Sequence, residues 1–95
     1  MKTFNRDPIK NKKMSDERNI SFDEVLYFIQ FGNVIDIIEH PNKEKYPIQK
    51  MFAIDISDYV YLVPFVESET EIFLKTIIPS RKATKQYLKE KGNPL

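Results

Sequence analysis

"MFAIDISDYVYLVPFV" (residues 51–66) holds two apolar runs, which are separated by a Ser-Asp pair at 57–58. Runs rich in β-branched and aromatic residues around a two-residue polar break predict a β-hairpin. The strands are expected at Gln49–Ile56 and Tyr59–Val66. Because proline cannot donate to a strand ladder, Pro64 should lie at a sheet edge or a bulge.

Two further segments extend this hairpin into a sheet. "VIDIIEH" (34–40) and "EIFLKTII" (71–78) have the same composition, and residues 3–5 can add a short first strand. Short connections favour an antiparallel meander of three to four strands, with one face covered by helices. Asp36 and Asp55 interrupt the apolar patterns, which is typical of edge protection.

Start and stop signals predict two N-terminal helices. Asp7-Pro8 supplies an N-cap and a first-turn proline for a polar helix over Pro8–Arg18. Ser21 and Glu24 form a capping box for a second, amphipathic helix. Gly32 suits the left-handed position that ends it.

A final helix follows a proline stop and a serine cap at Pro79-Ser80. On a helical wheel, one arc is basic and consists of Arg81, Lys82, Lys85 and Lys89. The opposite arc should pack on the sheet and consists of Ala83, Thr84, Tyr87 and Leu88. The fold class is therefore α+β, with N-terminal helices on an antiparallel sheet and a basic C-terminal helix.

Length and composition indicate one small domain. The chain has 95 residues and is 41% apolar, and we expect a single domain over residues 1–91 with a frayed tail at 92–95. The absence of cysteine excludes disulfides, thiolate metal sites and cysteine nucleophiles. No apolar run is long enough to span a membrane, so we expect a soluble cytoplasmic protein without a membrane partner.

Charge is segregated along the chain although the net charge is only +1. Residues 1–18 carry a net charge of +3, residues 19–79 carry −6 and residues 80–95 carry +4. Such a field can attract a polyanion at one face and a basic partner at another.

Most catalytic signatures are absent. The chain has two glycines, so there is no glycine-rich phosphate loop, and its one histidine rules out a multi-histidine metal site. We expect neither a metal nor a cofactor. Phosphate chemistry remains: Arg81 and Lys82 at a helix N-terminus could neutralise charge on a phosphate as RNA is cleaved. The alternative is a solvated helix face.

Three other side chains have two interpretations each. His40 is either a loop residue with local hydrogen bonds, which we favour, or a general acid or base. Tyr87 is either a packing residue or a catalytic group. Lys75 should share a strand face with Ile77, and it either extends into solvent or joins a basic cleft with Arg81.

Three blocks of sequence resemble the BrnT family of toxins: "FNRDPIK" (4–10), "ISFDEV" (20–25) and "IPSRKAT" (78–84). Their order and spacing match that family over nearly the whole chain. The resemblance implies a RelE-like fold and a bacterial type II toxin that cleaves RNA without a metal. It also implies a cognate antitoxin as partner, with operator DNA reached only through the toxin–antitoxin complex.

The same resemblance assigns four site residues. Arg81 and Lys82 match the "RKAT" block, Lys10 matches the first block, and Arg18 lies near the place of a family histidine. The expected phosphate-binding set consists of Lys10, Arg18, Lys75 and Lys85, and the expected catalytic set consists of Arg81, Lys82, Tyr87 and His40. The chain departs from the family in its acidic middle segment and in its short basic tail, reduced to residues 85–87.

The alternative function is a non-catalytic module that binds a protein or a nucleic acid. Exposed aromatic residues such as Tyr27 and Phe31, or a free sheet edge, would then contact the partner.

Overall fold

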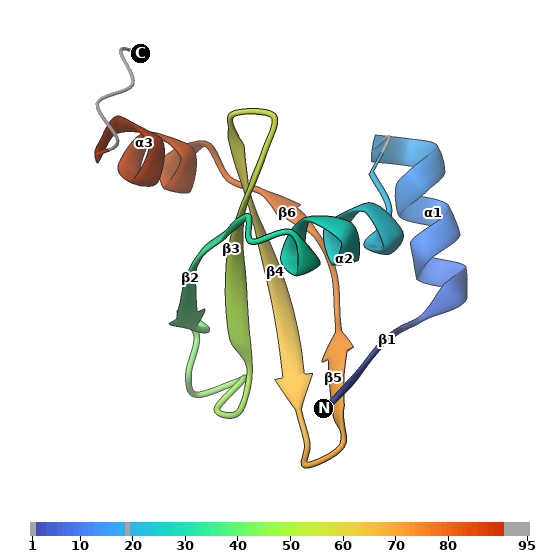
Figure 1. Cartoon of the computed structure of the whole chain (residues 1–95). Helices are drawn as coiled ribbons and strands as arrows, with labels where there is room; N and C mark the ends of the chain where they lie inside the picture. Colours follow the sequence, from blue (N-terminus) through green and yellow to red (C-terminus); the bar gives the residue numbers. More distant parts are fainter. Residues whose placement is uncertain (1, 19, 91–95) are drawn as a thin grey trace.

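The computed structural model describes residues 2–18 and 20–90, with only the backbone for residues 14, 15, 17, 18, 89 and 90. Its centre is a hairpin of β3 (Lys50–Ile56) and β4 (Tyr59–Glu67), whose two strands lie side by side in Figure 1. Around it lie β1 (Thr3–Arg6), α1 (Pro8–Arg18), α2 (Phe22–Gln30), β2 (Val34–Glu39), β5 (Glu71–Leu74), β6 (Ile78–Pro79) and α3 (Arg81–Glu90).

The sheet has the order β1-β5-β4-β3-β2, and β6 pairs with β4 beyond the end of β5. The predicted antiparallel meander is confirmed over β2 to β5. The sheet as a whole is mixed, because β1 adds to β5 in parallel, with Thr3 opposite Glu71 and Arg6 opposite Leu74.

The hairpin turn is confirmed at Ser57-Asp58. Both residues have positive φ, 54° and 64°, as a two-residue type I′ turn requires. The Asp58 N–H donates to Oδ1 of Asp55 at 3.1 Å, so Asp55 stabilises the turn that follows its strand.

Pro64 lies at a break in the ladder, as its missing N–H predicts. The Lys75 N–H donates to the Pro64 carbonyl at 2.8 Å, but proline has no N–H to return the bond. Beyond this point the register shifts by one residue, from Phe65 opposite Leu74 to Leu62 opposite Ile78. The single strand expected over 71–78 is therefore wrong: it is divided into β5 and β6 by a bulge.

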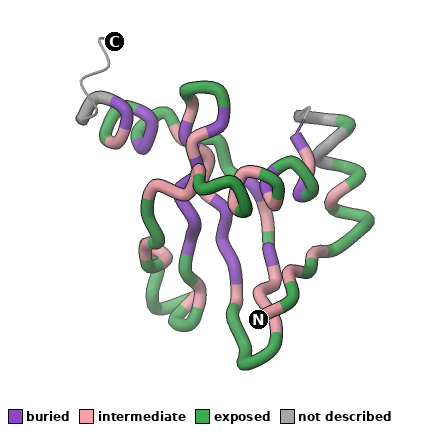
Figure 2. Tube along the Cα trace, in the orientation of Figure 1, coloured by how far each residue is buried: buried purple, intermediate pink, exposed green. Residues whose placement is uncertain are grey.

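The larger core lies on one face of the sheet, under α2. Phe52 and Ile54 of β3 point into it together with Phe22 and Val25 of α2. Figure 2 shows that burial is concentrated along the two central strands and falls away toward the turns.

A second, smaller core lies on the opposite face, under α3. Ala53 and Val60 are fully buried there against Ala83 and Leu88 of the helix. The expected helix-covered face is present under α2, and the structure adds a second one under α3, because consecutive residues of β3 point into two different cores.

The N-terminal helices are capped as predicted. Oδ1 of Asp7 accepts from the Ile9 N–H at 2.9 Å, and Ser21 Oγ accepts from the Glu24 N–H at 3.2 Å. Gly32 follows α2 with φ 82°, in the left-handed region expected of it.

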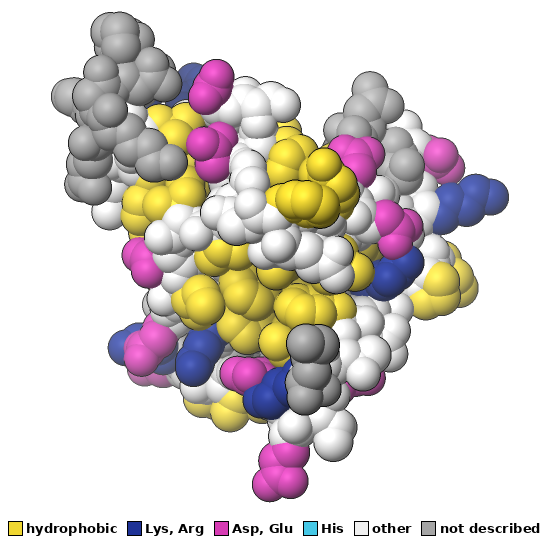
Figure 3. Space-filling view, viewed as in Figure 1, with side chains coloured by type: hydrophobic (Ala, Val, Ile, Leu, Met, Phe, Trp, Pro, Cys, Tyr) yellow, Lys and Arg dark blue, Asp and Glu magenta, His cyan; other side chains and the backbone are white. Residues whose placement is uncertain are grey.

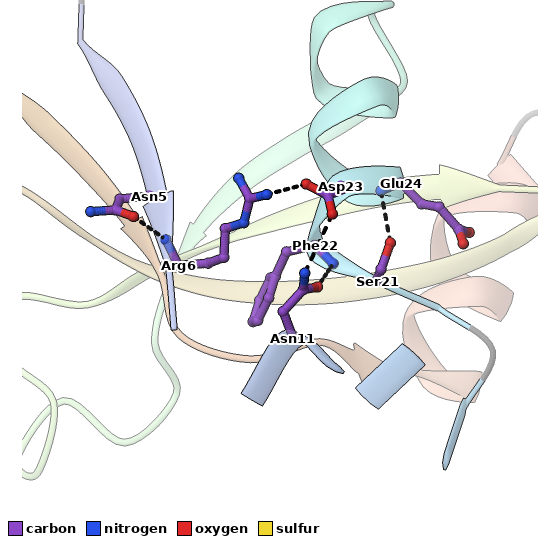
Figure 4. A network of polar contacts seen from close by, with 7 residues as sticks. All are labelled: Asn5, Arg6, Asn11, Ser21, Phe22, Asp23 and Glu24. Carbon is purple, nitrogen blue, oxygen red and sulfur yellow. Dashed lines mark hydrogen bonds and ion pairs between the residues drawn. The ribbon is translucent and has the colours of Figure 1, made fainter. Parts of the chain in front are cut away.

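A polar network joins α1, α2 and β1 (Figure 4). Asn11 of α1 accepts from the Phe22 N–H at 2.7 Å and donates to Asp23 at 3.3 Å. Asp23 also pairs with Arg6 of β1, so one carboxylate connects a strand and two helices. Through these bonds α1 is joined to α2, although its Ile9 side chain is 81% exposed.

Helix α3 is attached to β4 through one buried hydroxyl. Thr84 Oγ1 donates to the Ser80 carbonyl at 2.7 Å and accepts from the Val60 N–H at 2.8 Å. The Ser80 N–H in turn donates to the Val60 carbonyl at 3.0 Å. Both backbone groups of Val60 are thus satisfied by the segment that begins α3.

Among the described residues, none of the helices combines the length and the apolar character that crossing a membrane requires.

We predict that Thr84→Val lowers the free energy of unfolding by about 1–3 kcal/mol, because it leaves the buried Val60 N–H without an acceptor. Thermal and urea unfolding would measure the loss. Thr84→Ser keeps the hydroxyl and removes one methyl group, so it should cost about 0.8 kcal/mol. Equal stability of Thr84→Val and wild type would contradict this account of how α3 is attached.

Candidate functional site

Three of the four basic side chains of α3 face outward as the helical wheel predicted, and the fourth, that of Lys89, is outside the described residues. Arg81, Lys82 and Lys85 are exposed, whereas Ala83, Thr84 and Leu88 are buried on the sheet. Oγ of Ser80 caps the helix by accepting from the Ala83 N–H at 3.0 Å. Three cations therefore lie near the positive end of the α3 dipole, where an anion is favoured.

A groove of about 200 Å³ runs between α3 and the ends of β2 and β3. Its lining combines apolar residues with a few polar groups: Ile38, Glu39, Pro41, Met51, Leu62, Ser80, Lys82, Ala83, Gln86 and Tyr87. Two expected catalytic residues, Lys82 and Tyr87, thus line the same groove as a carboxylate, Glu39.

Tyr87 is held in place by the edge strand. Its hydroxyl donates to Oδ2 of Asp36 at 3.0 Å. Oδ1 of Asp36 accepts from the Ile37 N–H at 2.8 Å, a backbone group that the β2–β3 ladder leaves free. Asp36 therefore protects the sheet edge, as its position in an apolar strand indicated. It also fixes the orientation of the Tyr87 ring, which lines one side of the groove.

Glu39 forms an ion pair with Lys43, four residues further along the chain in the loop after β2. The Lys43 ammonium, by its hydrogen bond and by its charge, holds the pKa of the Glu39 carboxyl below its ordinary value. Glu39 is therefore ionised at neutral pH and presents hydrogen-bond acceptors only.

His40 lies beside the groove between two of its lining residues, Glu39 and Pro41, but makes local contacts. Its Nδ1 accepts from the Asn42 N–H at 3.1 Å, and its ring lies 4.5 Å from that of Tyr46. These contacts agree with the interpretation as a loop residue. Because Nδ1 is an acceptor, the proton of the neutral ring is on Nε2.

The other expected phosphate-binding residues lie elsewhere. Lys10 is exposed on α1, and the side chain of Arg18, also in α1, is outside the described residues. The Lys75 ammonium lies 5.4 Å from the centre of the Phe73 ring. The expectation that Lys75 and Ile77 share a face is wrong, because the bulge directs Ile77 into the core under α2.

The sequence prediction missed the polar groups that β2 and the middle of α3 bring to the groove. Neither Glu39 nor Gln86 is among the expected site residues. Both lie beside such residues in the chain, but their approach to one another depends on where α3 packs on the sheet. No local pattern reports that packing.

A larger hollow of about 540 Å³ lies near the entry to α2 and is lined by Ile20, Tyr61, Thr76, Ile78 and Pro79. It contains none of the expected site residues, so the groove beside α3 is the better candidate site. In the described part of the chain, no three His, Asp or Glu side chains gather as metal ligands would.

Comparison with known proteins adds no assignment: no protein-family model, no curated protein and no solved structure matches the chain.

We predict that Lys43→Met raises the pKa of the Glu39 carboxyl, which an NMR titration of that carboxyl would measure. Because the folded-state pKa is depressed, the pair stabilises the protein above the pKa of the unfolded carboxyl. This stabilisation is lost as the pH falls through the folded-state pKa. Wild type and Lys43→Met should therefore differ in stability near neutral pH and converge in acid. Lys45→Met, which removes a cation from over the Tyr46 ring, is the control and should leave the Glu39 titration unchanged.

Proposed function

We propose that the protein is a metal-independent endoribonuclease of the BrnT-like toxin type, with a RelE-like arrangement of its elements. Helix α2 on one face of an antiparallel meander, with α1 joined to it by polar bonds and a basic C-terminal helix at the end, supports this proposal. The three sequence blocks that resemble BrnT lie in β1 and the start of α1, at the start of α2, and at the start of α3.

The observation that carries the proposal is the groove beside α3, which Lys82 lines and next to which Arg81 lies in the chain. Cleavage of RNA at a 2′-hydroxyl needs positive charge on the phosphate as negative charge develops in the transition state. Arg81 and Lys82 are exposed at the start of α3, where they can supply it together with the helix dipole.

Proton transfer is the second requirement. Glu39 is a weak base because its pKa is lowered, and the Tyr87 hydroxyl already donates to Asp36. His40 is therefore the remaining candidate for proton transfer: its neutral ring would take the 2′-hydroxyl proton, and the imidazolium so formed would give a proton to the leaving oxygen. The bond from the Asn42 N–H to Nδ1 must open for this, because a doubly protonated ring has no acceptor. Tyr87 then acts as a wall of the site rather than as an acid.

A second candidate function, a protein-binding module, is favoured by one observation. Tyr27 and Phe31 of α2 are 54% and 67% exposed, and their rings stack with centres 4.4 Å apart. Figure 3 shows hydrophobic side chains gathered over this helix and over the sheet below it, where Ile37 is 53% exposed. A toxin also needs such a surface, since it must bind its antitoxin.

Purified wild type is expected to cut RNA in the presence of a chelator, and Arg81→Ala/Lys82→Ala should lose about 10²-fold or more of this activity. Lys12→Ala/Lys13→Ala removes the same charge from exposed positions of α1 and should retain activity. Sequencing of RNA ends would measure both. Wild-type protein that cuts no RNA would end the ribonuclease proposal, and an active double variant would refute only the assignment of the site.

We expect the aromatic pair to contact the antitoxin, for which a small reading frame beside this gene is the candidate. Tyr27→Ser/Phe31→Ser should weaken binding of that protein by about tenfold or more, measured by calorimetry on the co-expressed pair. Ile9→Ser removes an apolar side chain of greater exposure from α1 and should bind normally. Unchanged affinity in the double variant would exclude this surface from the interface.

A further inference from the structure

The groove beside α3 has the size of a single ring system. Its volume of about 200 Å³ is below the roughly 300–1,000 Å³ that holds a drug-sized ligand. Ile38, Met51 and Leu62 line it from the strands, and the Tyr87 side chain lines it from the helix. The hydrogen bond to Asp36 keeps that ring from rotating out of the way.

The polar groups of the groove are few and differ in kind. Lys82 supplies a cation, Gln86 supplies an amide that both donates and accepts, and Glu39 supplies a carboxylate that only accepts. Lys43 occupies one Glu39 oxygen, Oε2, which leaves Oε1 to accept from a ligand. A ligand that fits must therefore carry a flat apolar body and an N–H donor at its edge.

The positive charge around the groove indicates that the ring of the ligand is attached to anionic groups. Arg81 and Lys85 are exposed on α3, one helical turn apart, and Lys82, the neighbour of Arg81, lines the groove. A row of cations beside an apolar slot is complementary to a single nucleic-acid strand, whose phosphates follow the cations while a base enters the slot. A duplex cannot bind in this way, because its bases are stacked and paired.

We propose that this groove binds one unstacked base of a single-stranded RNA, and that Glu39 selects bases with an exocyclic amine over uracil. Adenine, cytosine and guanine each present an amine hydrogen to a carboxylate. Uracil presents a single ring N–H between two carbonyl oxygens, which repel the Glu39 charge. The proposal rests on the proposed function only in naming RNA as the strand that the site receives.

Binding can be measured apart from cleavage with 2′-O-methyl oligonucleotides, which lack the nucleophilic hydroxyl. Fluorescence anisotropy with labelled strands of about eight nucleotides would compare oligo(A), oligo(C) and oligo(U). Oligo(A) and oligo(C) should bind about fivefold or more tightly than oligo(U), and an RNA duplex should bind more weakly than either.

Variants separate the base contact from the phosphate contact. Glu39→Gln should remove most of the preference over oligo(U), because an amide can also donate to uracil carbonyls. Glu44→Gln changes an exposed carboxylate of the same loop that does not line the groove, and it should keep the preference. Lys82→Ala should weaken all three strands alike and reduce the salt dependence by about one phosphate contact.

Equal affinity for the three strands, a preference that survives Glu39→Gln, or no binding at all would each overturn the base-binding groove. The outcome for the ribonuclease proposal is separate. A base preference in a protein that cuts no RNA would support the base-binding groove and refute the ribonuclease proposal. Cleavage without any base preference would support the ribonuclease proposal and refute the base-binding groove.

Discussion

Burial of the β3–β4 hairpin on both faces is the constraint on which the rest of the structure depends. Phe52 and Ile54 face the core under α2, while the residue between them, Ala53, faces the core under α3. A shift of one residue in the pairing would exchange the two cores. Two features prevent this shift. One is the tight turn at Ser57-Asp58, and the other is the difference in size between Phe52 and Ile54 on one face and Ala53 on the other.

Pro64 has a comparable effect on how the last third of the chain is arranged. Its missing N–H ends the pairing with β5, and the chain resumes with β6 one residue out of register. This shift brings Ile77 under α2 while Ser80 reaches the Val60 backbone, so that α3 can begin over the other face. A proline in a central strand thus determines where the candidate site is built.

The features that could be predicted from the sequence are those whose chemistry is local. The Ser21 cap, the left-handed Gly32 and the Ser57-Asp58 turn each depend on side chains within a few residues. The apolar arc of α3 was also predictable, because a helix repeats at a known period. The near-continuous apolar run from Met51 to Ile54 was itself a sign of burial on both faces, since a one-sided strand would alternate with polar residues.

The features that could not be predicted depend on segments far apart in the chain. The groove exists because α3 packs over β3 and β4 beside the edge strand β2, and neither α3 nor β2 carries a pattern that reports the other. Lys82 and Tyr87 were therefore identified from composition and resemblance, whereas Asp36 and Glu39 gain their roles only from this packing.

The parallel pairing of β1 with β5 has a consequence for how the protein is made. Lys2 reaches Glu67, 65 positions further on, at 2.6 Å, and the strand beside it pairs with residues that follow Glu67. During synthesis β1 emerges from the ribosome long before β5 exists, so it stays without its sheet partner while α1 and α2 can already form. Completion of the sheet is therefore a late event in folding, and the segment that closes it is one of the earliest translated.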